Sequence, residues 1–426
     1  MRATQLARAA AALPLSGIRV VEMEALAAVP WAGMCLADFG AEVIRVDNAR
    51  HPPHFGTTVL GRGKTSVALD LKTSEGRRAC TALAATADVL LEGYRPSVME
   101  RLGLGPDDLC ADECNPGLIY CRLTGFGQDG PYAQRAGHDI NYIAITGALH
   151  AMTRGAHADP AARPLPPLNL LGDFAGGALS AVTGVLMALV ARQGNEGRGQ
   201  VVDAAMVDGT AYLMSFIHHL GALGRWNDAR PGTNLLDTGA PFYDTYACKD
   251  GAFVAVGAIE PQFYALLLEG LGLGAGAGGD GLPDQMDVPR WGELRQAFAA
   301  AFKTRTRDDW ASVFDERGDF ADACVTPVLS MTEAAANPHN VSRGLFQQGD
   351  SVGAPTPAPR LSATPAQPAA TDLQFQRSEA AATTSSVLRD VQQRLAAGAA
   401  GRNHAAALGD ADIEAAVAAI QQGGGE

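Results

Sequence analysis

The chain has 426 residues, of which 33 are Lys or Arg and 46 are Asp or Glu, so its formal net charge is −13. This length provides for two or three domains with hydrophobic cores of their own. The negative balance argues against a nucleic-acid-binding protein, which needs a broad basic surface, whereas a small anionic ligand needs only a few basic side chains. The seven cysteines are scattered and form no zinc-binding pattern, which favours reduced thiols.

The two ends of the chain carry little functional information. It begins MRATQLARAAAALPLSG, with two arginines and no acidic residue, a composition that a transit peptide shares. No reliable secretory cleavage pattern follows, and the last residues, QQGGGE, are not a peroxisomal signal. We therefore expect a cytoplasmic protein.

Short apolar runs alternate with helical stretches over the first 130 residues. Helices are indicated at residues 30–40 and 74–86. Buried strands are predicted at residues 18–23, 41–47, 65–71, 87–94 and 117–123. This alternation predicts an α/β fold with an open, mostly parallel sheet that helices cover on both faces. No G-x-G-x-x-G follows the first strand, and GRGKTS at residues 61–66 lacks the full P-loop spacing, so we reject both nucleotide-binding motifs.

Two longer apolar segments follow, at about residues 174–193 and 200–222. Their apolar residues run nearly all round, which predicts two helices that are buried, in part by another subunit. Residues 174–191 are barely long enough to cross a membrane, are rich in Gly and Ala, and have no second apolar span beside them. We therefore expect a buried helix here and no membrane association.

From about residue 225 the pattern changes to that of a smaller α+β domain. Lys249-Asp250-Gly251, between two aromatic and β-branched runs, predicts a β-hairpin, and a Gly-rich surface loop is predicted at residues 272–284. The prolines of residues 355–365 exclude a helix there. The chain thus divides into an N-terminal extension, a large domain, a linker helix, a small domain, a connecting segment and an Ala- and Gln-rich C-terminal extension, at residues 1–14, 15–200, 200–225, 226–335, 336–366 and 367–426.

Three titratable side chains, His138, Asp173 and Glu260, stand at the ends of apolar segments. From local sequence alone, Asp173 is most simply a helix N-cap, His138 a structural histidine and Glu260 a solvated turn residue. The same positions also suit catalysis, because a helix N-terminus offers free N–H donors and a positive dipole end that stabilise an oxyanion. Local sequence leaves both interpretations open.

The segments around these residues are AGHDINY, LNLLGDFAGG and LLDTGAPFYDTYACKDGAFVAVGAIEPQFY. Other long strings occur along the chain, namely LSGIRVVEM, GAEVIRVD, ADVLLEGYRPSVMERLGLGPDDL, NPGLIYCRLTGFGQDGPYAQRAGHD, GRGQVVDAAMVDG and CVTPVLSMTEAAANPHN. In this order they resemble the α-methylacyl-CoA racemases, a branch of the class III coenzyme A transferase family. The resemblance covers roughly residues 15–365, and it excludes the first dozen residues, the Gly-rich insert near residue 275 and the tail beyond residue 367.

The resemblance implies an enzyme that interconverts (R)- and (S)-2-methylacyl-CoA thioesters. Removing the hydrogen beside a thioester carbonyl needs a positioned base and a stabilised enolate oxygen, and inversion needs a second group on the opposite face. By the resemblance, His138 and Asp173 are this pair, and Glu260 holds and polarises the His138 imidazole. For Asp173 to act as both acid and base, burial must raise the pKa of its carboxyl. No metal or redox cofactor is required, and coenzyme A is part of the substrate.

Coenzyme A carries phosphate groups, so its site needs a few basic contacts. Arg62, Lys64 and Lys72 surround the third predicted strand, and each of them alone is most simply a solvated surface charge. By the resemblance, the coenzyme A site is formed by Arg45, Leu69, Asp70, Leu71, Lys72, Gly93, Tyr94, Arg95, Arg101, Gly137, Asp139, Ile140, Asn141 and Tyr142. Because a guanidinium binds a phosphate bidentately, Arg45, Arg95 and Arg101 are the favoured contacts.

The resemblance also implies an interlocked homodimer. Its Rossmann-like large domain is built from both ends of the chain and its small domain from the middle. His138 and Asp173 of one subunit are then expected to meet Glu260 of the partner subunit.

Two other functions are compatible with this fold. A coenzyme A transferase uses the aspartate that matches Asp173 as a nucleophile, which forms a mixed anhydride with the acyl group. That reaction does not need His138 with Glu260, so the presence of both favours the racemase. A non-catalytic acyl-CoA-binding protein is disfavoured by the complete His–Asp–Glu set. The sequence does not distinguish among a branched fatty acyl, a sterol side-chain and an arylpropionyl substrate.

Overall fold

The computed structural model describes residues 13–51, 59–155, 163–274, 281–315, 318–347, 353–367 and 386–394. The chain forms two compact units. The first comprises Met1–Thr146, Pro167–Leu213 and Pro355–Glu426, and the second comprises Gly147–Pro166 and Met214–Ala354. Most of both predicted extensions and residues 275–280 of the predicted Gly-rich loop lie outside the described residues.

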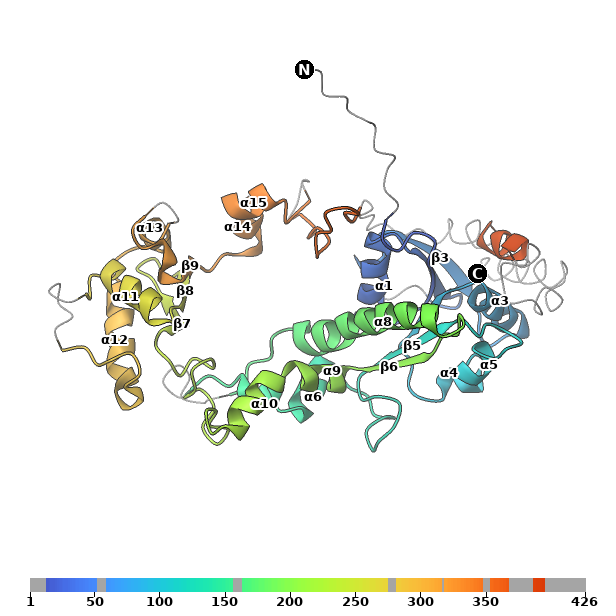
Figure 1. The fold of residues 1–426 in the computed structure, drawn as a ribbon, viewed down its shortest axis with the longest axis horizontal. Helices are drawn as coiled ribbons and strands as arrows, with labels where there is room; N and C mark the ends of the chain where they lie inside the picture. Colours follow the sequence, from blue (N-terminus) through green and yellow to red (C-terminus); the bar gives the residue numbers. More distant parts are fainter. Residues whose placement is uncertain are drawn as a thin grey trace, which may run out of the picture. The chain divides into compact units, whose positions relative to one another are not determined.

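The first unit is built on a six-stranded parallel β-sheet (Figure 1). Its strands are β1 (Arg19–Met23), β2 (Glu42–Asn48), β3 (Lys64–Leu69), β4 (Val89–Glu92), β5 (Ile119–Thr124) and β6 (Val201–Ala205), in the order β3-β2-β1-β4-β5-β6. The five strands predicted from the sequence and the predicted parallel α/β fold are thereby confirmed. The chain runs outward from β1 toward β3 and then crosses to β4 on the other side of β1. Such a reversal leaves a crevice at the carboxyl ends of the central strands.

Helices cover both faces of this sheet, because its strands carry apolar residues on both sides. One hydrophobic core joins the sheet to α1 (Ala28–Asp38) and α8 (Ser180–Gly194). The other core joins it to α3 (Ser74–Ala85), α4 (Val98–Arg101) and α5 (Pro106–Leu109) (Figure 1). The two predicted helices of this region, α1 and α3, are confirmed.

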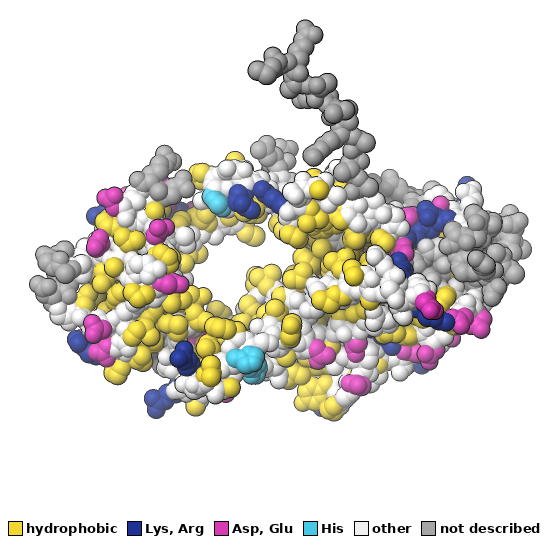
Figure 2. Space-filling model, viewed as in Figure 1, with side chains coloured by type: hydrophobic (Ala, Val, Ile, Leu, Met, Phe, Trp, Pro, Cys, Tyr) yellow, Lys and Arg dark blue, Asp and Glu magenta, His cyan; other side chains and the backbone are white. Residues whose placement is uncertain are grey.

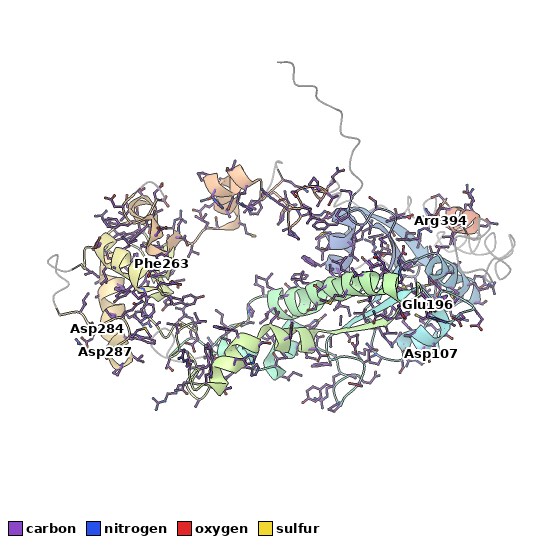
Figure 3. All side chains as sticks on the ribbon, viewed as in Figure 1. Asp107, Glu196, Phe263, Asp284, Asp287 and Arg394 are labelled. Atoms are coloured by element: carbon purple, nitrogen blue, oxygen red, sulfur yellow. The ribbon has the colours of Figure 1, made fainter. Side chains whose placement is uncertain are left out.

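A short helix from the C-terminal extension, residues 386–394, completes the second core. Its Leu388 and Val391 side chains are fully buried there. Arg394, which is labelled in Figure 3, pairs with Asp390 one turn earlier, at 2.9 Å. This part of the extension therefore belongs structurally to the first unit.

The prediction of one helix over residues 200–222 is wrong at its start. The segment begins as strand β6, which pairs in parallel with β5, and continues as α9 (Met206–Leu213) and α10 (Ser215–Ala222). A short apolar run cannot be assigned to a strand or a helix by periodicity alone. Here the β-branched run Val201–Val202 pairs with the edge of β5 that would otherwise be open, and so extends the sheet.

The other predicted helix begins earlier than expected and with a different geometry. Residues Leu170–Leu179 form a π-helix, η1, which continues directly into α8. Small residues let η1 approach α9 closely, since a Cβ on Gly209 would lie 1.8 Å from the backbone oxygen of Gly176. π-Helical turns inside α-helices occur frequently at functional sites.

Among the described residues, one helical segment, Leu170–Gly194, is long and apolar enough by length and composition to cross a membrane. Core helices of soluble proteins pass the same test. Within the 18-residue apolar window of this segment, 39% is buried inside the chain and the rest is not. The buried residues include Ala181, Val182 and Val185, which belong to the first core described above. The segment thus has a structural role within the first unit.

The two long apolar segments are only partly buried within the single chain, and their expected burial by another subunit stays a prediction. Met187, Val190 and Tyr212 are 66%, 69% and 82% exposed in the single chain, and α10 has no buried residue. Figure 2 shows hydrophobic side chains at the surface in this region. Large apolar areas at a protein surface commonly mark an interaction site.

The second unit is an α+β domain, as predicted. Its antiparallel sheet contains β7 (Tyr243–Ala247), β8 (Phe253–Gly257) and β9 (Val325–Pro327) in that order. The predicted hairpin joins β7 to β8, and Gly251 in its turn has the positive φ of 83° that favours glycine. The described helices of this unit are α7 (Ala148–Ala151), α10 (Ser215–Ala222), α11 (Pro261–Gly270), η2 (Val288–Arg290), α12 (Trp291–Phe302), α13 (Arg307–Val313), η3 (Ala321–Ala323), α14 (Met331–Ala336) and α15 (Pro338–Arg343).

Candidate active site

A cavity of about 680 Å³ lies in the first unit, at the carboxyl ends of the central strands. Residues 24–29, 93–96 and 123–126, which end or follow β1, β4 and β5, form much of its wall. His138 and Asp173 complete the wall. This is the crevice that the reversal of strand order predicts for the binding site of a parallel α/β sheet.

His138 reaches the cavity from the start of α6 (Asp139–Ile145), where it is the N-cap residue. The His138 backbone N–H donates a hydrogen bond to Asn141 Oδ1 at 3.0 Å, and the imidazole makes no capping hydrogen bond. The His138 side chain is exposed in the single chain. The backbone therefore caps the helix, and His138 contributes to the cavity wall.

Asp173 lies in the first turn of η1 and is half-buried. Its expected role as a helix N-cap is wrong, because Asn169 occupies that position. Burial raises the pKa of the Asp173 carboxyl, and the nearby Asp139 raises it further. Asn169 Nδ2, which donates to Asp173 Oδ2 at 3.3 Å, and His138 act in the opposite direction. A raised pKa makes a carboxyl better suited to act both as an acid and as a base.

The wall beside His138 is aromatic and rigid. The Tyr142 hydroxyl donates to the Gly137 backbone oxygen, and its ring packs edge-on against Phe126, with ring centroids 4.9 Å apart. Burial raises the pKa of Tyr142 to about 12, so its phenol stays neutral. Tyr142 therefore shapes the cavity rather than exchanging protons.

A second cavity, of about 340 Å³, lies at the ends of β2 and β3. Asn48 and Tyr94 line both cavities, which makes the two cavities neighbours. The predicted coenzyme A contacts that line the first cavity are Gly93, Tyr94, Arg95, Gly137, Asn141 and Tyr142. Those that line the second cavity are Leu69, Asp70, Leu71, Lys72, Tyr94 and Arg101. Lys72, Arg95 and Arg101 are exposed, so they give this double cavity positive charge that solvent can reach.

A buried ion pair fixes the loop after β4, whose Tyr94 lines both cavities. Glu92, fully buried at the end of β4, accepts a hydrogen bond from the Tyr94 backbone N–H at 2.7 Å. Its other carboxylate oxygen pairs with Arg122 Nε at 2.8 Å. Burial raises the pKa of Glu92 to about 7, although Arg122 and the Tyr94 N–H oppose this shift. The pair fixes the backbone at Tyr94.

Three predicted coenzyme A contacts line neither cavity. Arg45 is 3% exposed and pairs with Asp47 at 2.7 Å, because it lies in the middle of β2 rather than at its carboxyl end. Ile140 is 43% exposed on α6, and Asp139 beneath it is buried. Arg62 and Lys64 likewise pair with acidic residues inside the first unit, Asp38 and Glu22, and are not solvated surface charges.

Glu260 belongs to the second unit. It is exposed and is the N-cap residue of α11, whose first turn also carries Phe263 (Figure 3). The sequence predicts that Glu260 alone is a solvated turn residue, and its exposure agrees with this prediction. Its contact with His138 of a partner subunit stays a prediction.

Sequence reasoning missed several residues of the cavity wall, including Glu24, Asn48 and Arg135. Glu24 directly follows β1 and Asn48 ends β2, and the Asn48 backbone N–H donates to Glu24 Oε2 at 2.9 Å. The rule that ligands bind at the carboxyl ends of parallel strands could have identified both. Arg135, which stacks on Tyr132 at 3.9 Å, lies in a loop and gave no such signal.

The chemistry available in the first cavity is proton transfer or nucleophilic attack. An imidazole and a carboxyl with a raised pKa can exchange protons, and the same carboxylate can attack a thioester. In the part of the chain that the structure describes, no group of three or more His, Cys, Asp and Glu side chains is arranged to hold a metal ion.

Comparisons with known proteins identify the family of this chain. Residues 15–379 match the CoA-transferase family III model. The chain is 50% identical over 357 residues to alpha-methylacyl-CoA racemase of Mus musculus, covering 84% of this chain and 88% of that protein. It is 33% identical over 389 residues to succinyl-CoA–D-citramalate CoA-transferase of Chloroflexus aurantiacus, covering 83% and 89%. The crystal structure of a CaiB/BaiF family protein of Brucella suis aligns with a TM-score of 0.72 at 25% identity, over 89% of this chain and 99% of that one. The chain belongs to CoA-transferase family III.

Proposed function

We propose that this protein is an α-methylacyl-CoA racemase, an isomerase that interconverts (R)- and (S)-2-methylacyl-CoA thioesters. The observation that carries the proposal is the presence of His138 and Asp173 in one cavity, with a second, basic cavity beside it. The similarity to alpha-methylacyl-CoA racemase at 50% identity supports the same reaction. A family III transferase reaction is the alternative, because its nucleophile is a carboxylate in the same position.

In the proposed reaction, one group of the pair removes the α-hydrogen of the thioester as a proton, and an enolate forms. The other group returns a proton to the opposite face, so the configuration inverts; the two groups exchange roles for the other enantiomer. The raised pKa of Asp173 suits this alternation, since the carboxyl must both accept and donate a proton. This chemistry needs no metal or redox cofactor, and we expect activity to survive dialysis against a chelator.

The coenzyme A part of the substrate is proposed to bind in the second cavity, with its thioester end in the first. Lys72 and Arg101 line the second cavity and Arg95 lines the first, which suits an extended ligand with several phosphate oxygens. Tyr94, shared by both cavities, marks the passage between them.

Arg95→Ala is expected to raise the KM for acyl-CoA by about tenfold and to leave kcat nearly unchanged, since it removes a charge-assisted contact that substrate and transition state share. Arg198→Ala is the matched control. Arg198 is also an exposed arginine of the first unit, but it pairs with Asp112 at 2.7 Å and lines neither cavity. Steady-state kinetics of both variants test the assignment. An equal rise of KM in the control would contradict it.

The experiment that tests the function uses one enantiomer of a 2-methylacyl-CoA and no acceptor acid. The racemase is expected to convert it to the racemic thioester, which chiral chromatography of the hydrolysed acid detects. A stable enantiomer, together with transfer of coenzyme A once a dicarboxylic acid is added, would instead assign Asp173 as a nucleophile and identify a transferase.

We further propose that two chains form an interlocked homodimer in which Glu260 of the partner subunit holds the His138 imidazole. The exposed apolar residues Met187, Val190 and Tyr212 support an interface at this surface. Sedimentation of the wild-type protein at micromolar concentration is expected to give the mass of a dimer. Met187→Glu should shift the equilibrium toward the monomer and lower activity with it, and a monomeric, fully active wild type would contradict the proposal.

A further inference from the structure

A buried carboxylate connects the segments that carry His138 and Asp173. Asp139 directly follows His138 in the chain and is 4% exposed. Its Oδ2 accepts two backbone hydrogen bonds from the start of η1, from Gly172 N–H at 2.6 Å and from Asp173 N–H at 2.8 Å. N–H groups in the first turn of a helix lack partners within the helix, so this carboxylate satisfies two of them from a distant part of the sequence.

The fit of this carboxylate is tight. A Cβ on residue 172 would lie 2.9 Å from Asp139 Oδ2 and 3.0 Å from its Cγ, so only glycine leaves room for the contact. Asp139 lines neither cavity. Its side chain contacts the start of η1, and its expected role as a coenzyme A contact stays a prediction.

Asp139 is also a source of negative charge next to Asp173. The second carboxylate oxygen, Oδ1, is buried and has no hydrogen-bond partner among the described residues. Its charge raises the pKa of Asp173, whereas His138 lowers it. Other charged groups on elements packed against η1 have partners elsewhere: Asp38 pairs with Arg62, Arg122 with Glu92 and Arg192 with Asp88, and Asp203 accepts from the Gln128 N–H. Asp208 lies near Asp203, whose pKa its negative charge raises. Tyr142 is a neutral phenol near the same carboxyl.

We propose that Asp139 is a positioning residue that fastens the backbone of Asp173 to the segment of His138 and thereby fixes the separation of the two proton-transfer groups. The proposal rests on the proposed racemase function, since the separation matters only if both groups act on one carbon. Through its charge, Asp139 also raises the pKa of the Asp173 carboxyl.

Two variants separate the hydrogen bonds from the charge. Asp139→Asn keeps an oxygen that can accept from both N–H groups but removes the charge, so racemisation is expected to stay within about tenfold of wild type. The limb of the pH–rate profile that belongs to Asp173 should move to lower pH. Asp139→Ala removes the hydrogen bonds as well, and kcat is expected to fall about 100-fold, with KM unchanged, because small displacements of a catalytic group have effects of this size.

Gly172→Ala provides an independent variant, because it displaces the same carboxylate from the other side of the contact. It should lower kcat in the same way as Asp139→Ala. Circular dichroism and thermal unfolding establish which variants are folded. If Asp139→Ala does not fold, the pH profile of Asp139→Asn decides, since a purely structural carboxylate would leave the Asp173 limb where it is in wild type.

Two results would overturn the proposal: an unchanged pH profile in Asp139→Asn, or a rise of KM at constant kcat in Asp139→Ala, which would make Asp139 a substrate contact. Wild type is assayed first for racemisation and for transfer. A transferase outcome therefore refutes the proposed function on its own. In that event the same variants are measured in the transfer reaction, where misplacement of the Asp173 carboxylate must again lower kcat.

Discussion

Asp173→Asn and His138→Ala are each expected to lower the rate of racemisation by about a hundred- to ten-thousand-fold. Each substitution removes one of the two groups that must exchange a proton with the α-carbon, and inversion fails when either face lacks its group. The KM for acyl-CoA should change little, because the basic cavity that binds coenzyme A is intact. Chiral analysis of the product under initial-rate conditions measures both quantities.

Asp203→Asn is the matched control for Asp173→Asn. Asp203 is an aspartate of the same unit, on β6, and it accepts a hydrogen bond from the Gln128 N–H, but it lines neither cavity. Its substitution is expected to leave racemisation within a factor of a few of wild type. Racemisation retained by Asp173→Asn would contradict the assignment of this carboxyl.

The second large effect is on stability. Lys64→Met is expected to lower the free energy of unfolding of the first unit by about 3–5 kcal/mol, because removing one partner of a buried ion pair leaves the other charge uncompensated. Lys64 Nζ donates to Glu22 Oε2 at 2.6 Å and to the Pro30 backbone oxygen at 2.7 Å. The two side chains are 1% and 0% exposed. Burial raises the pKa of Glu22 and lowers that of Lys64, and each partner opposes the shift of the other.

The double variant Glu22→Gln/Lys64→Met tests this explanation. It removes both charges, and it should recover much of the stability that Lys64→Met loses, as measured by urea unfolding. Arg290→Ala, which breaks the exposed pair with Glu293 in the second unit, is expected to leave stability unchanged. Equal losses in Lys64→Met and the double variant would show that the charge of Glu22 is not the cause.

The sequence predicts most of the first five strands, α1, α3 and the hairpin at Gly251, because each depends on a local pattern of apolar and turn residues. It fails for residues 200–222, where pairing with β5 decides that the first residues form a strand. It also gives no sign of the π-helix η1, since a change of helical register leaves the apolar pattern nearly the same. Long-range pairing and helix register are therefore the parts of the fold that the local pattern does not specify.

The candidate site likewise has parts that local sequence could indicate and parts that depend on long-range contacts. Glu24 and Asn48 could have been identified from their positions at the carboxyl ends of predicted strands. No local sequence pattern indicates that His138 and Asp173 share one cavity, and that expectation came from the resemblance. Arg45 shows another limit of local sequence, since no local pattern indicates that its guanidinium is buried and paired with Asp47, two residues away; its expected contact with coenzyme A stays a prediction. The contact of Asp139 with the start of η1 joins segments more than thirty residues apart, which no local pattern reveals.

The most direct test of two-base catalysis is α-hydrogen exchange of each pure enantiomer in deuterated buffer, with wild type, His138→Ala and Asp173→Asn. Wild type is expected to exchange both enantiomers and racemise them. Each variant should exchange one enantiomer, a different one for each variant, without racemising it, because a single base remains on a single face. Exchange of both enantiomers by either variant, or exchange of the same enantiomer by both, would contradict the placement of His138 and Asp173 on opposite faces of the substrate.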